Sequence, residues 1–597
     1  MSAINEIEDE EKQKDKPLVE EEKEAVVDIS SKKIKLLYII TVGGVLLIVV
    51  LVAIIVIFLG NNISDNENPN EDNNNKDNET IPDYDPDIDP YINSSFIAFY
   101  QTSSGGEEVK LFNEYIIDKI SLMQVDNETI NLANISNIYK FNSIGDHKVI
   151  IELNKTLPST KEMFKDCKNL IKIIFTDFKT QHIRNMAGMF YGCNLLSSLD
   201  LSIFDTINVT NMSYLFYDCF DINNIVLNSF DTSNVLDMKY MFSGCEKITS
   251  LDLRSFNTKK LKEIKYIFYR CYELNNIEVG NNFIISGIND LSGIFSDCFH
   301  LSKINITILD TSQTTDMSYM FRRCIKLTSI DLSNFDTSKV INMKGMFSDC
   351  FVLTSIELSK FDTSNVEDMS ELFTTCTLIK ELNLKNFKTS KVKNMDYMFY
   401  RLTSIKSLDL SSFDTSQVTT MKYMFDFCSL IENLDLSNFD TSKVTDMSFM
   451  FAASPSLTSI NLSGFNTENV ITFENMFYGD SALLNVDFSS FKTPNLINIE
   501  CMFFKCSSLT SLDLSGFDTS KITSFISLFS FCHNLTYIDI SNFSTQSFIK
   551  ESTYIFPEKP DNGTVIFNSK LFDKDLLNII FKGWEIIDVN SNEFTIY

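Results

Sequence analysis

The chain has 597 residues and a formal net charge of −29, so it repels phosphate backbones and direct binding of nucleic acid is disfavoured. It contains 51 Phe but one Trp, and 13 Cys but four His. The His residues lie far apart and pair with no nucleophile. No CxxC pair or Cys/His cluster has the spacing of a metal site, so we predict no metal ligands and no cofactor.

The first 90 residues predict a membrane anchor. Residues 1–35 are rich in Glu and Lys and lack apolar periodicity, which predicts a disordered cytoplasmic tail. Residues 36–59 carry no charge and can cross a hydrocarbon core of about 30 Å, which predicts a transmembrane signal-anchor helix. Lys35 and two nearby lysines place the N-terminus in the cytoplasm and the rest of the chain outside the plasma membrane. Residues 60–90, acidic and rich in Asn, Asp and Pro, predict an extended linker.

A 26-residue repeat occupies residues 158–545. It is clearest in the Phe residues that open the sequence FDT, which are Phe204, Phe230, Phe256, Phe335, Phe361, Phe413, Phe439 and Phe517. A period of 20 to 50 residues is typical of a solenoid, whose stacked units bury what one unit cannot. We expect about 15 turns. Residues 91–157 and 546–597 lose the period, so we predict an N-terminal and a C-terminal cap there.

Each unit predicts a strand, a turn and a short helix. Leu408 and Leu410 alternate around a polar residue, which indicates a strand with one buried face. The DTS segment that follows is typical of a turn. From Val418 to Cys428 the apolar residues recur at steps of mostly three, and a capping side chain such as Asp446 precedes the first Met of most units, which indicates a helix. The predicted fold class is therefore an α/β, leucine-rich-repeat-like solenoid preceded by one transmembrane helix.

Twelve cysteines follow the same period. They are Cys167, Cys193, Cys219, Cys245, Cys271, Cys298, Cys324, Cys350, Cys376, Cys428, Cys506 and Cys532. The spacing fits a column of buried thiols, and it also permits disulfides between adjacent turns. We favour thiols because Leu402, Ser454 and Asp480 fill the same column and would leave cysteines without partners.

The unit L-x-x-L-D-L-S-x-F-D-T-S-x-V-x-x-M-x-x-M-F-x-x-C resembles the 26-residue surface-protein repeat of the BspA-like leucine-rich repeat group. The clearest copies are residues 408–428 and 512–532, and the match covers about 160–545. The resemblance implies a leucine-rich-repeat-like solenoid on a cell surface, with roles in adhesion or host contact in some members.

One surface pattern is a candidate partner-binding face. The central, outward position of the strand carries an acid or an amide in most units, which predicts a ribbon along one face. Its members are Asp200, Asp252, Glu278, Asn305, Asp331, Glu357, Asn383, Asp409, Asp435, Asn461, Asp487, Asp513 and Asp539. Like charges on neighbouring strands repel, so the ribbon favours hydration, counter-charge or a basic partner. A solvated polar face, a binding face and a calcium ladder all remain open. A second Asp column, in the turn, is explained by local hydrogen bonds.

Exposed sequons are consistent with glycosylation of the outer part of the chain. They include Asn62, Asn78, Asn93, Asn127, Asn208, Asn305, Asn461 and Asn534. No G-x-S-x-G, H-E-x-x-H, P-loop or G-x-G-x-x-G motif supports catalysis, so we predict no enzyme. The predicted function is that of a single-pass cell-surface protein whose solenoid binds protein or glycan partners, or mediates adhesion. The alternative is a structural surface-coat protein without a specific ligand.

Overall fold

The computed structural model divides the chain into two units, Met1–Asp85 and Pro86–Tyr597. It describes residues 94–303, 306–545, 562–590 and 595–596. The predicted tail, transmembrane helix and linker lie outside the described residues. Within the described ranges, no helix is long and apolar enough to span a membrane.

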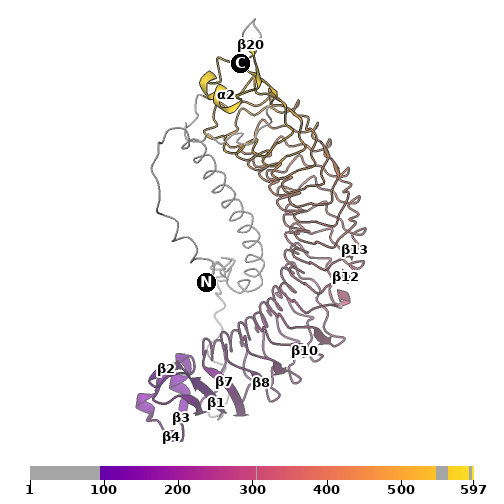
Figure 1. Cartoon of the computed structure of the whole chain (residues 1–597). Helices are drawn as coiled ribbons and strands as arrows, with labels where there is room; N and C mark the ends of the chain where they lie inside the picture. Colours follow the sequence, from indigo (N-terminus) through magenta and orange to yellow (C-terminus); the bar gives the residue numbers. More distant parts are fainter. Residues whose placement is uncertain (1–93, 304–305, 546–561, 591–594, 597) are drawn as a thin grey trace, which may run out of the picture. The chain divides into compact units, whose positions relative to one another are not determined.

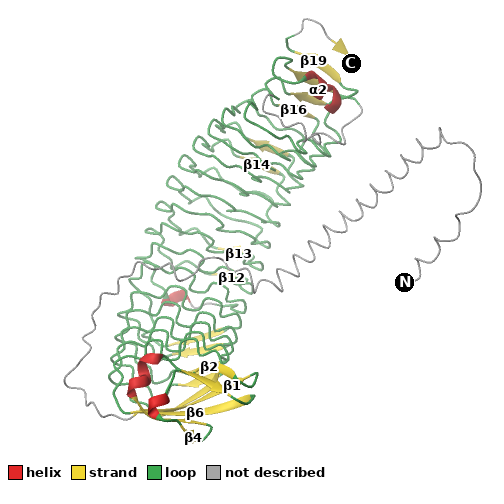
Figure 2. Ribbon diagram, turned by 90° about the vertical axis from the view of Figure 1, so that its left-hand side faces the viewer, coloured by secondary structure: helices red, strands yellow, loops and turns green. Residues whose placement is uncertain are grey.

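The described part begins with an antiparallel sheet in the strand order β4-β3-β6-β1-β7 (Figure 2). Apolar residues alternate along β1, so Phe96, Ala98 and Tyr100 are buried while the residues between them are partly exposed. A smaller sheet pairs β2 with β5. The elements of this region are β1 (Ser94–Thr102), β2 (Glu107–Lys110), η2 (Glu114–Lys119), β3 (Ile120–Val125), β4 (Glu128–Thr129), η3 (Leu132–Asn134), β5 (Ile138–Phe141), β6 (Gly145–Leu153) and β7 (Leu170–Asp177).

After β7 the chain runs in stacked coils of about 26 residues (Figure 1). The strand segments of neighbouring coils pair in parallel register, mostly in separate two-stranded sheets, so that Leu251 opposes Ile277 and Leu434 opposes Ile460. The elements of the coils are β8 (Ser198–Asp200), β9 (Asn224–Val226), β10 (Ser250–Leu253), β11 (Asn276–Val279), η4 (Ile306–Ile308), β12 (Ser329–Ile330), β13 (Ser355–Ile356), β14 (Asn433–Asp435), β15 (Ser459–Asn461), β16 (Ser511–Asp513) and β17 (Tyr537–Asp539).

The parallel ladder continues beyond the last repeat. β18 pairs with β17 and β19 pairs with β18, both in parallel, and β20 pairs with β19 in antiparallel. The elements are β18 (Thr564–Phe567), α2 (Lys574–Ile580), β19 (Glu585–Asp588) and β20 (Thr595–Ile596). The side chain of Asp573 caps α2 by accepting a hydrogen bond from the backbone N–H of Leu576.

The predicted helix of each unit was wrong. In the coil that follows Asn211, Tyr214 and Asp218 have φ values of 57° and 54°, in the left-handed region, which interrupts any run of helical residues. The backbone N–H groups of Met212 and Phe216 donate to carbonyls of the next coil at 2.9 Å instead of closing helical bonds. The segment is a series of tight turns, so the array is a β-solenoid with little helix.

The array has about 13 turns, two fewer than the sequence predicts. A second set of parallel bridges joins the residues that were expected to cap helices, such as Asp446 and Thr472. Among the described residues this set has no bridge from Glu263 to Asp290, across the one 27-residue unit, and none beyond Asn498. The regular geometry is therefore interrupted where the period changes and near the C-terminal end of the array.

Columns of identical side chains form the core. Successive Phe rings stack, with centroids 5.8 Å apart between Phe321 and Phe347 and 5.4 Å apart between Phe451 and Phe477. The rings are buried, as are the Met residues beside them. Stacking one coil on the next thus removes from water a large apolar surface that a single coil leaves exposed.

The cysteine column consists of free, buried thiols, which confirms the thiol interpretation. Every member after Cys167 donates to the backbone carbonyl of a core Phe in the preceding coil, as Cys350 does to Phe321 at 3.1 Å. Ser454 replaces cysteine and donates to the carbonyl of Phe425 at 3.2 Å. The column therefore favours a small side chain with a hydrogen-bond donor, and burial raises the pKa of Cys350 to about 12, which keeps the thiol protonated.

A buried threonine in the turn joins each coil to the next. Thr441 Oγ1 donates to the carbonyl of Asn466 at 2.8 Å and accepts from the N–H of the same residue at 2.9 Å. The buried members of this column are Thr180, Thr206, Thr232, Thr258, Thr311, Thr337, Thr363, Thr389, Thr415, Thr441, Thr467, Thr493 and Thr519. This position requires a hydroxyl, because its side chain must both donate and accept a hydrogen bond.

Replacing Thr441 with Val should destabilise the array by about 1–3 kcal/mol, because Val keeps the shape but leaves two backbone groups without their partner. The urea midpoint of unfolding, followed by circular dichroism, measures the effect. Thr441→Ser is the control and should lose less, since it retains the hydroxyl. An unchanged midpoint in Thr441→Val would show that the hydroxyl does not join the coils.

Candidate functional site

The described members of the acidic and amide ribbon lie in or next to the strands of their coils, except Asn383, Asp409 and Asp487, whose coils form no strand there, so the strand predicted around Leu408 and Leu410 was wrong. All are exposed except Asp539, which is half-buried, and Asn305 lies outside the described residues. The parallel register brings some members directly opposite one another. Asp252 opposes Glu278, and Asp513 opposes Asp539. Other acids face a neutral neighbour: Asp435 opposes Asn461, and Asp200 opposes Val226.

Each ribbon side chain also shapes its own coil. Asp435 Oδ1 accepts a hydrogen bond from the backbone N–H of Ser437 at 3.1 Å, and Asp513 accepts one from Ser515 at 3.0 Å. Asn461 and Glu357 make the same bond through their own oxygens. This bond turns the chain at the end of the strand. It explains why Asp and Asn exchange in the column, because both offer the same oxygen.

In several ribbon acids these hydrogen bonds lower the pKa of the carboxyl group. The N–H of Ser437 lowers the pKa of Asp435, and the hydroxyl of Ser411 lowers the pKa of Asp409. Asp409 receives both the N–H and the hydroxyl of Ser411 on one oxygen, Oδ1. The other carboxylate oxygen faces outward with no bond to the described chain, so it remains available to a partner.

Counter-charge reaches the ribbon from Arg254 and, at Asp409, from Lys385. Arg254 lies 2.6 Å from Asp252 and 3.5 Å from Glu278, and its guanidinium lowers the pKa of Asp252. All three groups are exposed, so the pairs contribute little to stability. In the described residues no group of three or more His, Cys, Asp or Glu side chains has the arrangement to hold a metal ion. Calcium needs six to eight oxygens, so the ladder hypothesis gains no support here.

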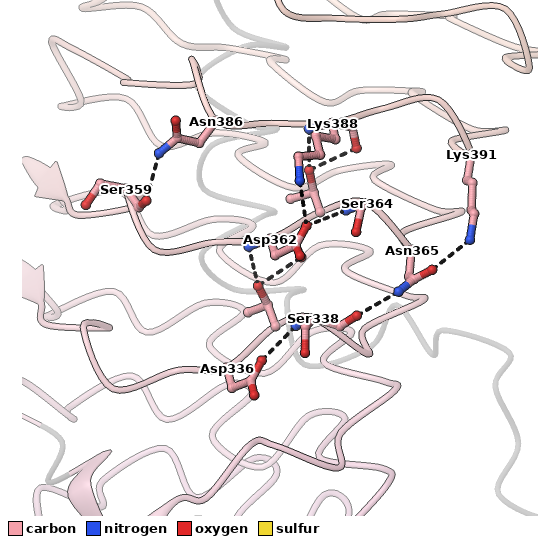
Figure 3. A network of polar contacts seen from close by, with 11 residues as sticks. Asp336, Ser338, Ser359, Asp362, Ser364, Asn365, Asn386, Lys388 and Lys391 are labelled. Carbon is pink, nitrogen blue, oxygen red and sulfur yellow. Dashed lines mark hydrogen bonds and ion pairs between the residues drawn. The ribbon is translucent and has the colours of Figure 1, made fainter.

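The Asp column of the turn makes the local bonds that the sequence predicts. Asp336 and Asp362 accept from the N–H groups of Ser338 and Ser364 at 3.0 and 3.1 Å (Figure 3). Lys388 lies 3.7 Å from Asp362. This face satisfies many of its polar groups through contacts between coils.

A column of Asn, Gln and Lys runs beside that turn. Asn365 donates to the carbonyl of Ser338 and accepts from Lys391 Nζ, both at 2.7 Å (Figure 3). Asn386, in the ribbon-side turn, donates to the carbonyl of Ser359 at 2.7 Å. These bonds cross from one coil to the next, so the surface amides reinforce the stacking.

The described sequons are exposed, at Asn127, Asn208, Asn461 and Asn534. The Asn208 amide nitrogen, which a glycan would occupy, donates to the carbonyl of Gln181 at 2.8 Å. The other predicted sites are Asn62, Asn78, Asn93 and Asn305, which lie outside the described residues.

One buried constellation escaped the sequence analysis. His147 Nδ1 lies 2.7 Å from Asp126 Oδ2, and His147 Nε2 lies 3.1 Å from Thr102 Oγ1. The Thr102 hydroxyl, however, donates to the carbonyl of Ser143 at 2.8 Å, and Nε2 lies 3.1 Å from the same carbonyl. The hydroxyl proton is therefore directed away from the imidazole. These hydrogen bonds hold the bend before β6 against the end of β1.

Two acids are buried as well, of which the sequence analysis placed Asp480 in the cysteine column and missed Asp426. Asp480 stands in the cysteine column and accepts from the N–H of Ser454 at 2.8 Å, and burial raises its pKa well above the ordinary value. Burial also raises the pKa of Asp426 to about 7. Among the described residues, Asp480 Oδ2 and Asp426 Oδ1 are buried without a hydrogen-bond partner. The period predicts their burial, but their acidic identity breaks the pattern.

Comparison with known proteins identifies one family. The profile of the family described as Mycoplasma protein of unknown function, DUF285, matches residues 158–282, 273–380, 368–482 and 456–566. No curated protein matches the chain significantly.

Several solved structures are similar to the chain. The pneumococcal vaccine antigen PcpA is 15% identical over 69% of this chain and 85% of its own, with a TM-score of 0.28. The functional domain of InlJ from Listeria monocytogenes, whose description includes a cysteine ladder, is 14% identical over 70% and 76%, with a TM-score of 0.18. Mouse RP105 in complex with MD-1 is 13% identical over 72% and 85%, with a TM-score of 0.22. At these TM-scores the likenesses carry no argument about function.

Asp426 should make the array less stable as the pH rises. Its folded-state pKa lies above the unfolded value, so its favourable contribution is complete below about pH 4 and is lost as the pH passes 7. Asp426→Asn should therefore raise the free energy of unfolding at pH 8 by on the order of 1–3 kcal/mol and should change little at pH 4. Thermal unfolding at both pH values measures this. Asp440→Asn, at an exposed turn, is the control; equal effects of the two variants would contradict the role of burial.

Proposed function

We propose a binding function for this chain, which belongs to the family described as Mycoplasma protein of unknown function, DUF285. The protein is a single-pass membrane protein of the cell surface, and its repeat array, outside the cell, binds protein partners or mediates adhesion. The apolar segment 36–59 and the resemblance of the repeat to BspA-like surface proteins support this localisation.

The observation that carries the proposal is the outward ribbon on the strands. Hydrogen bonds lower the pKa of acids such as Asp409 and Asp435, most of the described acids accept a bond from their own coil, and the same position recurs from coil to coil. Strands in such a ladder are about 4.8 Å apart, so the ribbon presents negative charge at regular intervals. A partner with positively charged side chains on an extended segment is complementary to it.

Binding along the ribbon is multivalent. One exposed ion pair contributes roughly 0–1 kcal/mol, so a single contact is weak. When several contacts form along one array, each later contact is intramolecular and the overall affinity rises without any new type of contact. A long solenoid is suited to this, because its repeats provide an extended surface.

A triple variant tests the ribbon. Asp409→Asn, Asp435→Asn and Asp513→Asn together remove three charges but keep the oxygen that holds each turn. Immobilised polylysine is the probe, and its binding by the full-length chain in detergent is measured by biolayer interferometry at about 0.1 M salt. We expect the affinity to fall at least several-fold without loss of the folded circular dichroism spectrum.

The matched control removes the same number of charges from the turn column. Asp414→Asn, Asp440→Asn and Asp518→Asn also keep their turn-forming oxygens. If the ribbon is the binding face, this variant binds nearly as well as the wild type. Equal losses in both variants would mean that net charge alone drives binding, and the ribbon would then be rejected. Lateral self-association without binding of the basic probe would favour the surface-coat alternative.

A separate experiment tests the topology. Cells that carry different tags at the two ends of the chain are treated with protease without permeabilisation. The C-terminal tag should be lost and the N-terminal tag protected, because the positive flank of residues 36–59 stays in the cytoplasm. Protection of both tags in intact cells would contradict the surface location.

A further inference from the structure

A cavity of about 410 Å³ opens on the repeat array away from the ribbon residues. It is lined by Arg184, Asn208, Thr210, Asn234, Leu236 and Lys260. These residues come from four successive coils and form two columns at the 26-residue period. The volume is within the range of small-molecule sites.

The rim of the cavity is basic although the protein is acidic. Arg184 and Lys260 are exposed, as is the neighbouring Lys262. Glu263 is an exposed acid beside them in sequence, but it does not line the cavity. Among the described contacts, the Arg184 guanidinium has no acidic partner. A planar guanidinium with unused N–H groups is suited to bind a carboxylate with two parallel hydrogen bonds.

The floor of the cavity supplies oxygen acceptors. Asn208 uses its nitrogen to donate to the carbonyl of Gln181 at 2.8 Å, which leaves Oδ1 as its remaining polar atom. Thr210 donates its hydroxyl to the carbonyl of Arg184 at 3.2 Å, so its oxygen can still accept. Asn234 is occupied at both ends, because it accepts from Lys260 Nζ at 2.6 Å and donates to the carbonyl of Ile207 at 2.7 Å.

Leu236 adds an apolar contact, since about a third of its side chain is exposed at the cavity (36%). The site thus combines cationic donors, oxygen acceptors and a small apolar surface. The acceptors need a ligand with hydroxyl groups, and the donors need an anion. Inorganic phosphate at neutral pH supplies the charge but few hydroxyl donors, and a neutral sugar supplies the hydroxyls without the charge.

We propose that this cavity binds an acidic sugar, with the sugar carboxylate on Arg184 and the hydroxyls on Asn208 and Thr210, while Lys260, bonded to Asn234, adds positive charge at the rim. The net charge of −29 disfavours long polyanions, so the ligand is a single acidic residue, free or at the end of a glycan. The site uses none of the ribbon residues and does not rest on the function proposed above.

Glucuronate and glucose are matched probes, because they differ only by the carboxylate. The full-length chain is produced in a bacterial host, so that Asn208 carries no glycan, and is purified in a non-ionic detergent. Binding is measured by saturation-transfer NMR and by titration up to about 10 mM, the range expected of a weak monosaccharide site. We expect glucuronate to bind at least tenfold more tightly than glucose and than inorganic phosphate.

Arg184→Gln should weaken glucuronate binding roughly tenfold or more, because it removes a charged bidentate donor. Thr210→Val should weaken glucuronate but leave the weak binding of acetate unchanged, since acetate has no hydroxyl. The matched control is Lys443→Gln, which occupies the column of Lys260 and bonds Gln417 at 2.6 Å, but lies outside the cavity. Circular dichroism verifies that each variant is folded.

Three outcomes would overturn the proposal. They are no binding of glucuronate at about 10 mM, equal binding of glucose or phosphate, and equal losses in Arg184→Gln and Lys443→Gln. Loss in Arg184→Gln with retention in Lys443→Gln supports it. Because ribbon residues are unchanged in these variants, failure here leaves polylysine binding unaffected.

Discussion

The hydrogen bond from one coil to the next is the interaction on which the array depends. In the segment after Asn342, Met343, Gly345 and Phe347 donate their N–H groups to carbonyls of the following coil at 2.8 to 3.1 Å. A buried N–H without a partner costs about 1–3 kcal/mol, so a coil that lacks a neighbour loses several such bonds. This requirement favours a constant period, and the one 27-residue unit keeps the same bonds, because Phe268 donates to the carbonyl of Ile294 at 3.2 Å.

This constraint explains why residue types repeat in columns. Each side chain lies next to its counterpart one coil away, so a residue that fits once fits in every coil. The thiol of Cys324 and the hydroxyl of Ser454 both donate a hydrogen bond to a Phe carbonyl. The acid at Asp480 receives a bond instead of giving one, and its buried second oxygen makes that position costly. The residue type in a column therefore depends on the backbone group with which its side chains form hydrogen bonds.

The sequence predicts the solenoid, because a constant period is read directly from it, but it predicts only some of the strands, since the segment with Leu408 and Leu410 forms none. The helix prediction was wrong because apolar residues at steps of three, as at Val418 and Met421, also fit successive tight turns. The turns require left-handed residues, and Tyr423 and Phe427 adopt φ values of 58° without any glycine to mark them. Other coils carry a sequence signal for these turns, because Gly345 and Gly293 occupy the same position with φ values of 57°. Glycine recurring inside a supposed short helix is evidence for a turn.

For the candidate site, the sequence predicts on which face a side chain lies but not which groups it hydrogen-bonds. The outward position of Asp409 follows from strand alternation, whereas its bond to Ser411 depends on how the strand ends. The cavity at Arg184 needs four coils stacked in register, so no single repeat reveals it. Side chains in constant columns satisfy backbone groups in most coils, whereas in a variable column only some members do, as Thr210 does with the carbonyl of Arg184. The column that runs from Arg184 through Thr210 and Leu236 to Lys262 changes charge, size and polarity at every step. Specific recognition is therefore expected where the columns vary, and repeated weak binding where they do not.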